Sequence, residues 1–213
     1  MSRKCLFILL ALCMQMPVWA QSSNDAVLRE GVSRRQAKAA KKLSDDKKFY
    51  WTGKVPVEEG VVTFRKKIAC GGQSPQAVTE VVGKFAENLV ERSGRTNISQ
   101  VTVADKEQGK VIASMAEEMV FKSRAWEKDV TEFYYLLTFD VQEGGVTVTI
   151  NNISYKYEEG RESGGAYLKA EDWITDKVAF NKSKTKLLKE PAKFRRATID
   201  RANAIFKEVE ALF

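Results

Sequence analysis

Histidine is absent from this chain of 213 residues, and its absence limits the possible chemistry more than any residue that is present. Hydrolases of the Ser-His-Asp and Cys-His types need an imidazole as their general base. Ser-x-x-Lys, which can activate a serine without histidine, occurs at Ser44 with Lys47 and at Ser183 with Lys186, about as often as chance predicts. The other boxes that such enzymes require are missing from the sequence. We therefore predict no catalytic residue and expect that the protein is not an enzyme.

Acidic pairs are the remaining source of acid–base chemistry. Glu117 and Glu118 lie in a predicted strand, where neighbouring side chains point to opposite faces and cannot converge on one bond. Glu158 and Glu159 precede a glycine turn, a position typical of solvated acids. Zinc is not expected without histidine, and the sequence contains no calcium loop, P-loop or dinucleotide motif. The sequence thus predicts neither a metal site nor a cofactor.

Aromatic side chains are the candidates for a binding function. Trp126 and Trp173 lie in polar surroundings near the ends of predicted elements, where an exposed indole can anchor a partner. Tyr155 and Tyr157 can line one face of a sheet. These four residues are the predicted binding residues, and their partner is either an unidentified protein or an apolar ligand. Packing in the core is the alternative for each of them.

The N-terminus has the three parts of a secretory signal peptide. Arg3 and Lys4 are basic, residues 5–14 form an unbroken apolar run, and residues 18–20 (VWA) resemble a signal-peptidase site. The run is shorter than the ~20 residues that span a bilayer. We predict that residues 1–20 are removed and that the chain is exported to the periplasm or the extracellular space, either free or associated with the envelope. An uncleaved membrane anchor is the alternative.

Positive charge is concentrated behind the signal peptide. Residues 21–50 contain eight Lys or Arg against four Asp or Glu, which leaves about +1 on the rest of the mature chain. The pattern predicts a basic, partly helical leader, either a solvated tether or a weak contact with an anionic surface. The nearly neutral remainder does not predict a nucleic-acid partner. Cys70 is the single cysteine after the signal, and we expect a buried side chain rather than a reactive thiol.

Periodic patterns begin at Trp51. Alternating apolar residues predict a strand that Gly71 and Gly72 end, and Ser74-Pro75 then caps a helix over residues 75–92. Further strands are expected over residues 98–103, 111–121, 133–141 and 146–157. Glycines at 144 and 145 indicate a hairpin turn, and a change of parity at Asn151-Asn152 predicts a β-bulge.

The C-terminal part of the chain is more polar and helical. Residues 171–174 predict a short helix or turn, and Pro191 opens a long helix. The apolar stripe of this helix consists of Phe194, Ala202, Ile205, Val209 and Leu212. Such a stripe docks either on the sheet of its own domain or on a partner, because an apolar stripe must be covered.

The order of these elements predicts an α+β fold. We expect a curved antiparallel sheet of about five strands, with the 75–92 helix on one face and a C-terminal helical extension. The predicted organisation is a signal peptide over residues 1–20, a leader over 21–50, an α+β domain over 51–160 and the extension over 161–213.

Several local strings carry a resemblance. They are residues 51–57 (WTGKVPV) with 60–64, residues 105–107 with 109–112, and the hairpin from 135–141 to 146–153. Together with the signal peptide they resemble a family of secreted bacterial proteins with domain of unknown function 4468, which has a TBP-like fold. The resemblance covers about residues 51–158 and implies a fold but no reaction. It does not imply DNA binding, because a shared fold alone does not transfer function.

The sequence therefore predicts a non-enzymatic binding or interaction module of the bacterial cell envelope. One alternative is a hydrolase that uses only carboxylates and lysines on envelope or sugar substrates. The other is a carrier of an apolar ligand between the sheet and the C-terminal helix. A deep cleft with converging acidic side chains would favour the enzyme.

Overall fold

The computed structural model describes residues 34–95, 97–124, 127–157 and 165–213. The predicted signal peptide, most of the first half of the leader and Trp126 lie outside these residues. Residues 46–213 form one compact unit, and the helix over residues 34–45 belongs to a second unit. Within the described ranges, no helix combines the length and the hydrophobicity that a membrane span requires.

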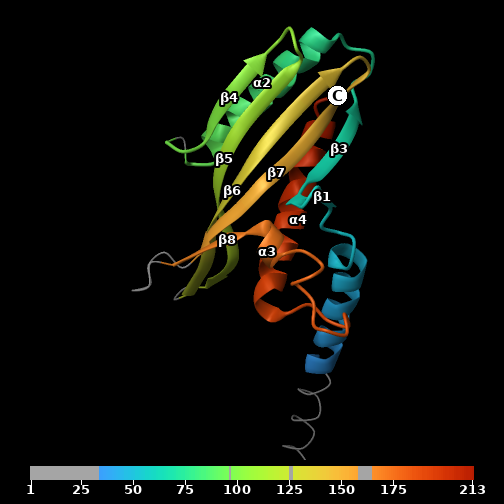
Figure 1. Cartoon of the computed structure of the whole chain (residues 1–213), viewed down its shortest axis with the longest axis vertical. Coiled ribbons are helices and arrows are strands. Elements are labelled where there is room, and N and C mark those ends of the chain that lie inside the picture. Colours follow the sequence, from blue (N-terminus) through green and yellow to red (C-terminus); the bar gives the residue numbers. More distant parts are fainter. Residues whose placement is uncertain (1–33, 96, 125–126, 158–164) are drawn as a thin grey trace, which may run out of the picture. The chain divides into compact units, whose positions relative to one another are not determined.

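The larger unit is built on a six-stranded antiparallel sheet (Figure 1). Its strand order is β3-β7-β6-β5-β4, and β8 pairs with the part of β7 that β3 leaves free. The strands are β3 (Phe64–Ala69), β4 (Gln100–Asp105), β5 (Lys110–Arg124), β6 (Glu127–Gln142), β7 (Gly145–Tyr157) and β8 (Ala166–Lys169). A separate hairpin is formed by β1 (Val57–Glu58) and β2 (Val61–Val62). The predicted α+β sheet is confirmed.

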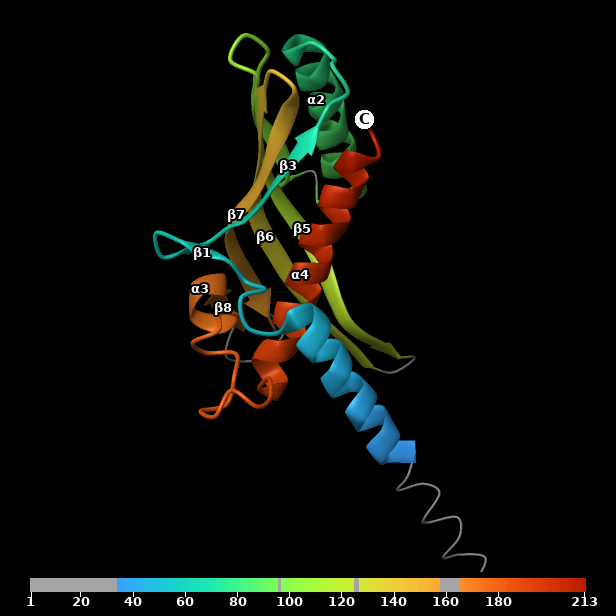
Figure 2. The ribbon, with the colours of Figure 1, turned by 90° about the vertical axis from the view of Figure 1, so that its right-hand side faces the viewer.

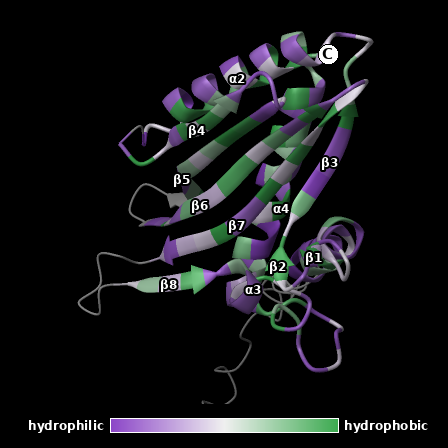
Figure 3. Cartoon of the chain, turned by 45° about the horizontal axis from the view of Figure 1, so that its top comes forward, coloured by the Kyte–Doolittle hydropathy of each residue, from purple (hydrophilic) through white to green (hydrophobic). Residues whose placement is uncertain are grey.

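Both long helices cover the same face of this sheet (Figure 2). They are α2 (Pro75–Arg92) and α4 (Lys189–Glu210), and the shorter elements are η1 (Asp46–Tyr50) and α3 (Ala170–Trp173). The central strands alternate hydrophobic and hydrophilic residues along their length (Figure 3). The hydrophobic side chains of β5, β6 and β7 therefore pack beneath the two helices, where they form the core.

The predicted helix over residues 75–92 is confirmed. The Ser74 Oγ accepts a hydrogen bond from the Ala77 N–H at 3.3 Å, and Pro75 occupies the first turn. A proline is tolerated there because the N–H that it lacks would have no partner within the helix. The buried residues recur at intervals of three and four: Val78, Val82, Phe85, Ala86 and Leu89.

The predicted β-bulge is also present. The register between β6 and β7 shifts between Tyr134 and Leu136, and Asn152 has a φ of 51°. This left-handed conformation is one that asparagine tolerates better than most residues. Because the bulge reverses the alternation, Ile150 before it and Ile153 after it both point into the core.

The apolar stripe of α4 packs on the sheet of its own unit. Phe194 is 1% exposed, and its ring lies 4.6 Å from Phe121 and 5.0 Å from Tyr155, measured between ring centroids. Ala202, Ile205 and Val209 are buried as well. Only the last residue of the predicted stripe differs, since Leu212 is 39% exposed. The helix is thus integral to the core rather than appended to it.

Two features differ in detail from the sequence pattern. Strand β8 lies in a stretch for which only helix or irregular structure was expected, because its four residues are too few to show a period. Residues 46–50, expected in the leader, belong to the compact unit. Asp46 accepts two hydrogen bonds of 2.6 Å from Arg196, and the Tyr50 hydroxyl donates to Asp200 at 2.9 Å.

Arg195 on α4 joins segments that are far apart in sequence. Its side chain is completely buried and donates to the carbonyl oxygens of Tyr50, Trp51 and Ile174 at 2.6–2.7 Å. The same guanidinium donates to the Asp176 carboxylate at 2.6 Å. Burial lowers the pKa of Arg195, and its bond to Asp176 opposes this shift. One cation therefore holds both the segment before the sheet and the segment before α4.

Replacing Arg195 with methionine should destabilise the fold strongly. The change keeps an aliphatic chain but leaves three carbonyl groups and Asp176 without their donor. We expect a loss of about 3–5 kcal/mol in the free energy of unfolding, measured by urea titration with tryptophan fluorescence. Arg65→Met is the control, because Arg65 is half exposed and pairs with Glu58 at the surface, and it should cost no more than ~1 kcal/mol. Equal stability of the two variants would contradict this role.

Candidate functional site

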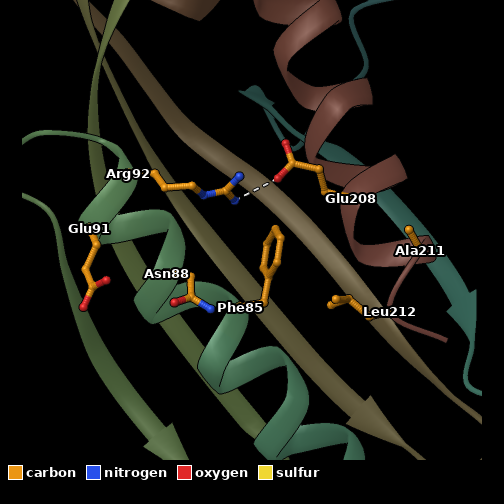
Figure 4. A pocket seen from close by; sticks show the side chains of 7 residues that line it. All are labelled: Phe85, Asn88, Glu91, Arg92, Glu208, Ala211 and Leu212. Carbon is orange, nitrogen blue, oxygen red and sulfur yellow. Dashed lines mark hydrogen bonds and ion pairs between the residues drawn. The ribbon is translucent and has the colours of Figure 1, made fainter.

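A groove lies between α2 and the C-terminal end of α4 (Figure 4). Its volume is about 490 Å³, and it is broadly open to solvent. Four of its residues come from α2, and three come from the end of α4 and the residues after it. The lining residues are Phe85, Asn88, Glu91, Arg92, Glu208, Ala211 and Leu212.

The apolar part of the groove consists of three side chains. Phe85 is 7% exposed and packs edge-on against Phe139 of β6, with ring centroids 6.1 Å apart. This contact fixes the phenyl ring on the sheet, so that the ring forms a rigid wall. Leu212 and Ala211 close the opposite side, and Leu212 is far more exposed than Phe85. An apolar group entering the groove would therefore meet a fixed ring and a terminal, accessible leucine.

The polar rim is held by an ion pair that crosses the groove. The Arg92 Nη2 lies 2.8 Å from a Glu208 carboxylate oxygen, and Figure 4 shows this contact between the two helices. Arg201, about two helical turns before Glu208, lies 3.5 Å from the other carboxylate oxygen. Glu208 is thus shared by two guanidinium groups from different helices. This arrangement fixes the spacing of the two groove walls.

The same network continues to the sheet. Arg201 donates two hydrogen bonds of 2.7 Å to the carboxylate of Glu117 on β5, a bidentate geometry. The Tyr135 hydroxyl donates to Glu117 at 2.6 Å. Burial and the Glu117 carboxylate raise the pKa of Tyr135 well above its ordinary value, so the phenol stays neutral. Burial lowers the pKa of Arg201, but the hydrogen bonds to Glu117 outweigh it and the net shift is upward.

The carboxylates around the groove do not converge. Figure 4 shows the Glu91 carboxylate turned away from Glu208, on the far side of α2. Glu117 points beneath α4 while Glu118, its neighbour, pairs with Lys128 at 2.6 Å, as opposite faces of a strand require. Within the described ranges, no group of three His, Cys, Asp or Glu is placed to hold a metal ion. The geometry of this groove suits binding of an apolar group rather than acid–base chemistry.

Two of the predicted binding residues, Tyr155 and Trp173, pack in or against the core away from the groove. Tyr155 is 0% exposed, and its hydroxyl lies 2.7 Å from the Thr198 Oγ1 on α4. Trp173 is partly buried with its ring 6.0 Å from Phe194. Both side chains therefore contribute to packing, the alternative that the sequence left open for them. Trp126 lies outside the described residues. Cys70 is buried too, and burial raises the pKa of its thiol.

Tyr157 belongs to a half-buried polar cluster at the start of α4. The Lys193 ammonium donates to the Tyr157 hydroxyl at 2.6 Å and to Asp129 at 3.0 Å, and lies 4.2 Å from the centre of the Tyr157 ring. Burial lowers the pKa of Lys193, but these hydrogen bonds outweigh it and the net shift is upward. A protonated lysine is neither a nucleophile nor a base. The role of the cluster is therefore structural, because Lys193 on α4 binds Asp129 and Tyr157 on the sheet.

The groove residues were not predicted as a site. Arg92 and Glu208, which pair across the groove, are 116 residues apart in the sequence, and no local pattern joins them. Leu212 did stand out as the end of an apolar stripe, but the pattern could not show that it alone is exposed. Phe85 was expected in the core, where it does lie.

Comparison with known proteins defines the class of fold. The description "Domain of unknown function (DUF4468) with TBP-like fold" matches residues 64–156. A crystal structure of a DUF4468 family protein from Bacteroides ovatus ATCC 8483 is 32% identical, with a TM-score of 0.72 over 78% of this chain and 94% of that one. A TBP-like protein from Parabacteroides distasonis ATCC 8503 is 20% identical, with a TM-score of 0.59 over 75% and 96%. No curated protein matches.

The fold is therefore a TBP-like α+β fold. The chain belongs to the DUF4468 family, which confirms the resemblance that its strand and turn sequences carry.

Adjacent glutamates on β5 allow a test of the network behind the groove. Glu117→Gln removes the negative charge that Arg201 and Tyr135 contact and should cost about 2 kcal/mol in the free energy of unfolding, because hydrogen bonds to charged groups contribute about 1.5–3 kcal/mol. Glu118→Gln is the matched control, since Glu118 and Lys128 are solvent-exposed, and it should stay within ~0.5 kcal/mol of the wild type. Urea unfolding measures both. Similar losses of unfolding free energy in the two variants would show that the network around Glu117 adds no more stability than a surface ion pair.

Proposed function

We propose that this protein is a non-catalytic binding module of the bacterial cell envelope. In this proposal the groove between α2 and the end of α4 receives an apolar side chain from a partner protein. The observation that carries the proposal is the combination of a fixed apolar wall at Phe85 with an exposed leucine and a charged rim. Export is supported by the signal-peptide pattern of residues 1–20. A non-catalytic role is supported by the absence of histidine from the sequence.

The form of the groove favours a protein segment over an enclosed small ligand. Its lining residues come from α2 and from the end of α4 with the residues after it (Figure 4), and the groove is broadly open to solvent. Small-molecule sites usually enclose most of their ligand. An apolar anchor that projects from a partner surface needs only partial enclosure, because the partner itself covers the remaining side.

The rim supplies a criterion for the partner. Arg92 and Glu208 form an ion pair across the groove, while Asn88 extends the polar border on the α2 side. A partner that suits this border carries polar or charged residues on both sides of one large apolar residue. Such an arrangement of an apolar centre and a polar border is the usual anatomy of protein interfaces.

The apolar-ligand carrier is less well supported. Its ligand was expected between the sheet and the C-terminal helix, but Phe194, Ile205 and Val209 fill that space. The enzyme alternative also lacks support around the groove. Glu208 is bound by Arg92 and Arg201, and Glu117 is bound by Arg201 and by the Tyr135 hydroxyl. We therefore locate binding at the end of α4.

Site-specific photocrosslinking tests the groove directly. A benzophenone amino acid at position 212, in the protein produced in its own cells, should give one discrete protein adduct. The same residue at position 57 should not, although Val57 is exposed to a similar degree. Asn88→Trp, which fills the groove, should abolish the adduct, and Glu87→Trp should leave it, because Glu87 is exposed on α2 but does not line the groove.

Circular dichroism and thermal melting establish that both tryptophan variants remain folded. An adduct that persists in Asn88→Trp, or that forms equally well from position 57, would exclude the groove as the binding site.

A further inference from the structure

A lysine-rich surface lies at the end of the larger unit where α4 begins. It is formed by two segments, residues 46–54 and residues 177–190. Together they contain eight lysines and two acidic residues, and every one of the lysines is exposed. The lysines are Lys47, Lys48, Lys54, Lys177, Lys182, Lys184, Lys186 and Lys189. We call this surface the basic end.

The two segments of the basic end are held together by the core. Trp51 packs edge-on against Phe180, with ring centroids 4.9 Å apart. Arg195 donates to the carbonyl oxygens of Tyr50 and Trp51 on one side and to that of Ile174 on the other. Two segments that are far apart in the sequence, joined by Trp51 and Phe180, therefore contribute to one surface, which the local charge pattern alone does not reveal.

The acidic residues of the basic end do not neutralise its lysines. Asp46 is bound by Arg196 at 2.6 Å, and Glu190 lies 3.2 Å from the half-buried Lys193. Asp176, which directly precedes the second segment, is bound by Arg195 at 2.6 Å. In the described part of the chain, none of the eight lysines forms a salt bridge within 4.0 Å. The surface thus keeps its positive charge.

The loop that carries three of these lysines is ordered by hydrogen bonds between its own residues. The Asn181 Oδ1 accepts hydrogen bonds from the N–H groups of Thr185 and Lys186 at 2.9 and 3.0 Å. Leu188 donates its N–H to the Ala179 carbonyl at 2.8 Å, which closes the loop at its base. Because the polar groups of the loop are satisfied internally, the lysine side chains at 182, 184 and 186 remain directed to solvent.

Two apolar side chains are exposed among these lysines. Phe49 is 46% exposed and Leu188 is 39% exposed. The Lys48 ammonium lies 4.8 Å from the centre of the Phe49 ring, so that charge and apolar surface are adjacent. Lysines that flank exposed aromatic and aliphatic residues are typical of surfaces that bind at the headgroup layer of a membrane.

We propose that the basic end docks on an anionic phospholipid surface. Lysines bind the headgroup phosphates, and Phe49 and Leu188 enter the boundary between headgroups and acyl chains. The charge favours an anionic partner, and the apolar residues favour a bilayer over a soluble polyanion. The helix over residues 34–45, which directly precedes Asp46, adds five Lys or Arg against one Asp to the same stretch of chain. Binding here is independent of the groove and goes beyond the proposed function.

Vesicle co-sedimentation tests this inference with the chain that begins at Gln21. Vesicles of phosphatidylcholine and phosphatidylglycerol in a ratio of about 3:1 should bind the protein, and vesicles of phosphatidylcholine alone should not. The triple variant Lys182→Gln, Lys184→Gln and Lys186→Gln should bind at least about tenfold more weakly. The matched control replaces Lys67, Lys84 and Lys106 by glutamine, removes the same charge from other exposed positions, and should bind within about threefold of the wild type.

The double variant Phe49→Ser and Leu188→Ser separates a bilayer from other anionic partners. It should lose vesicle binding most clearly at high salt, where the charge contribution is screened. Equal losses in the two triple variants would overturn the proposal, because net charge alone would then explain binding. Wild-type protein that binds heparin but not the anionic vesicles would assign the surface to a soluble polyanion instead. Thermal melting of all variants confirms that they are folded.

Discussion

The buried guanidinium of Arg195 joins three segments of the chain around one positive charge. A buried charge without partners is expensive, so the backbone must bring acceptors to it. The acceptors here are three carbonyl groups and one carboxylate, contributed by the segment before the sheet and by the segment before α4. Arg195 itself lies on α4, whose apolar stripe packs on the sheet. The position of α4 is thereby fixed, and with it the basic end at the start of the helix.

The far end of α4 is positioned by a second set of charges. Arg201 bridges Glu117 on the sheet and Glu208 on the helix, and Glu208 in turn contacts Arg92 on α2. A helix of 22 residues spans about 33 Å, so the two ends of α4 can serve different surfaces without sharing residues. The groove and the basic end are consequences of one rigid element that is anchored at both ends to the same sheet.

Much of the fold could be predicted because its signals are local. The Ser74-Pro75 cap and the spacing from Val78 onward define α2, and the change of parity at Asn151-Asn152 defines the bulge in β7. Strand β8 could not be predicted, since four residues show no period and form a strand only by pairing with β7. The groove was missed for a similar reason: its charged pairs join helices that are separated by most of the chain. Trp173 was predicted as a binding residue because its polar neighbours in sequence do not reveal that its ring packs near Phe194. Tyr155 was predicted because the strand pattern does not show that α4 covers its face of the sheet.

Native-state hydrogen exchange along α4 tests whether this helix is a permanent wall of the groove. We expect amides from Phe194 to Val209 to exchange only through global unfolding, with the same free energy as the amides at the buried positions of β6. The last residues, 211–213, should exchange at lower free energy, because they form the accessible end of the groove. Exchange of the entire helix at a free energy well below that of β6 would show that α4 detaches from the sheet, and would contradict the account.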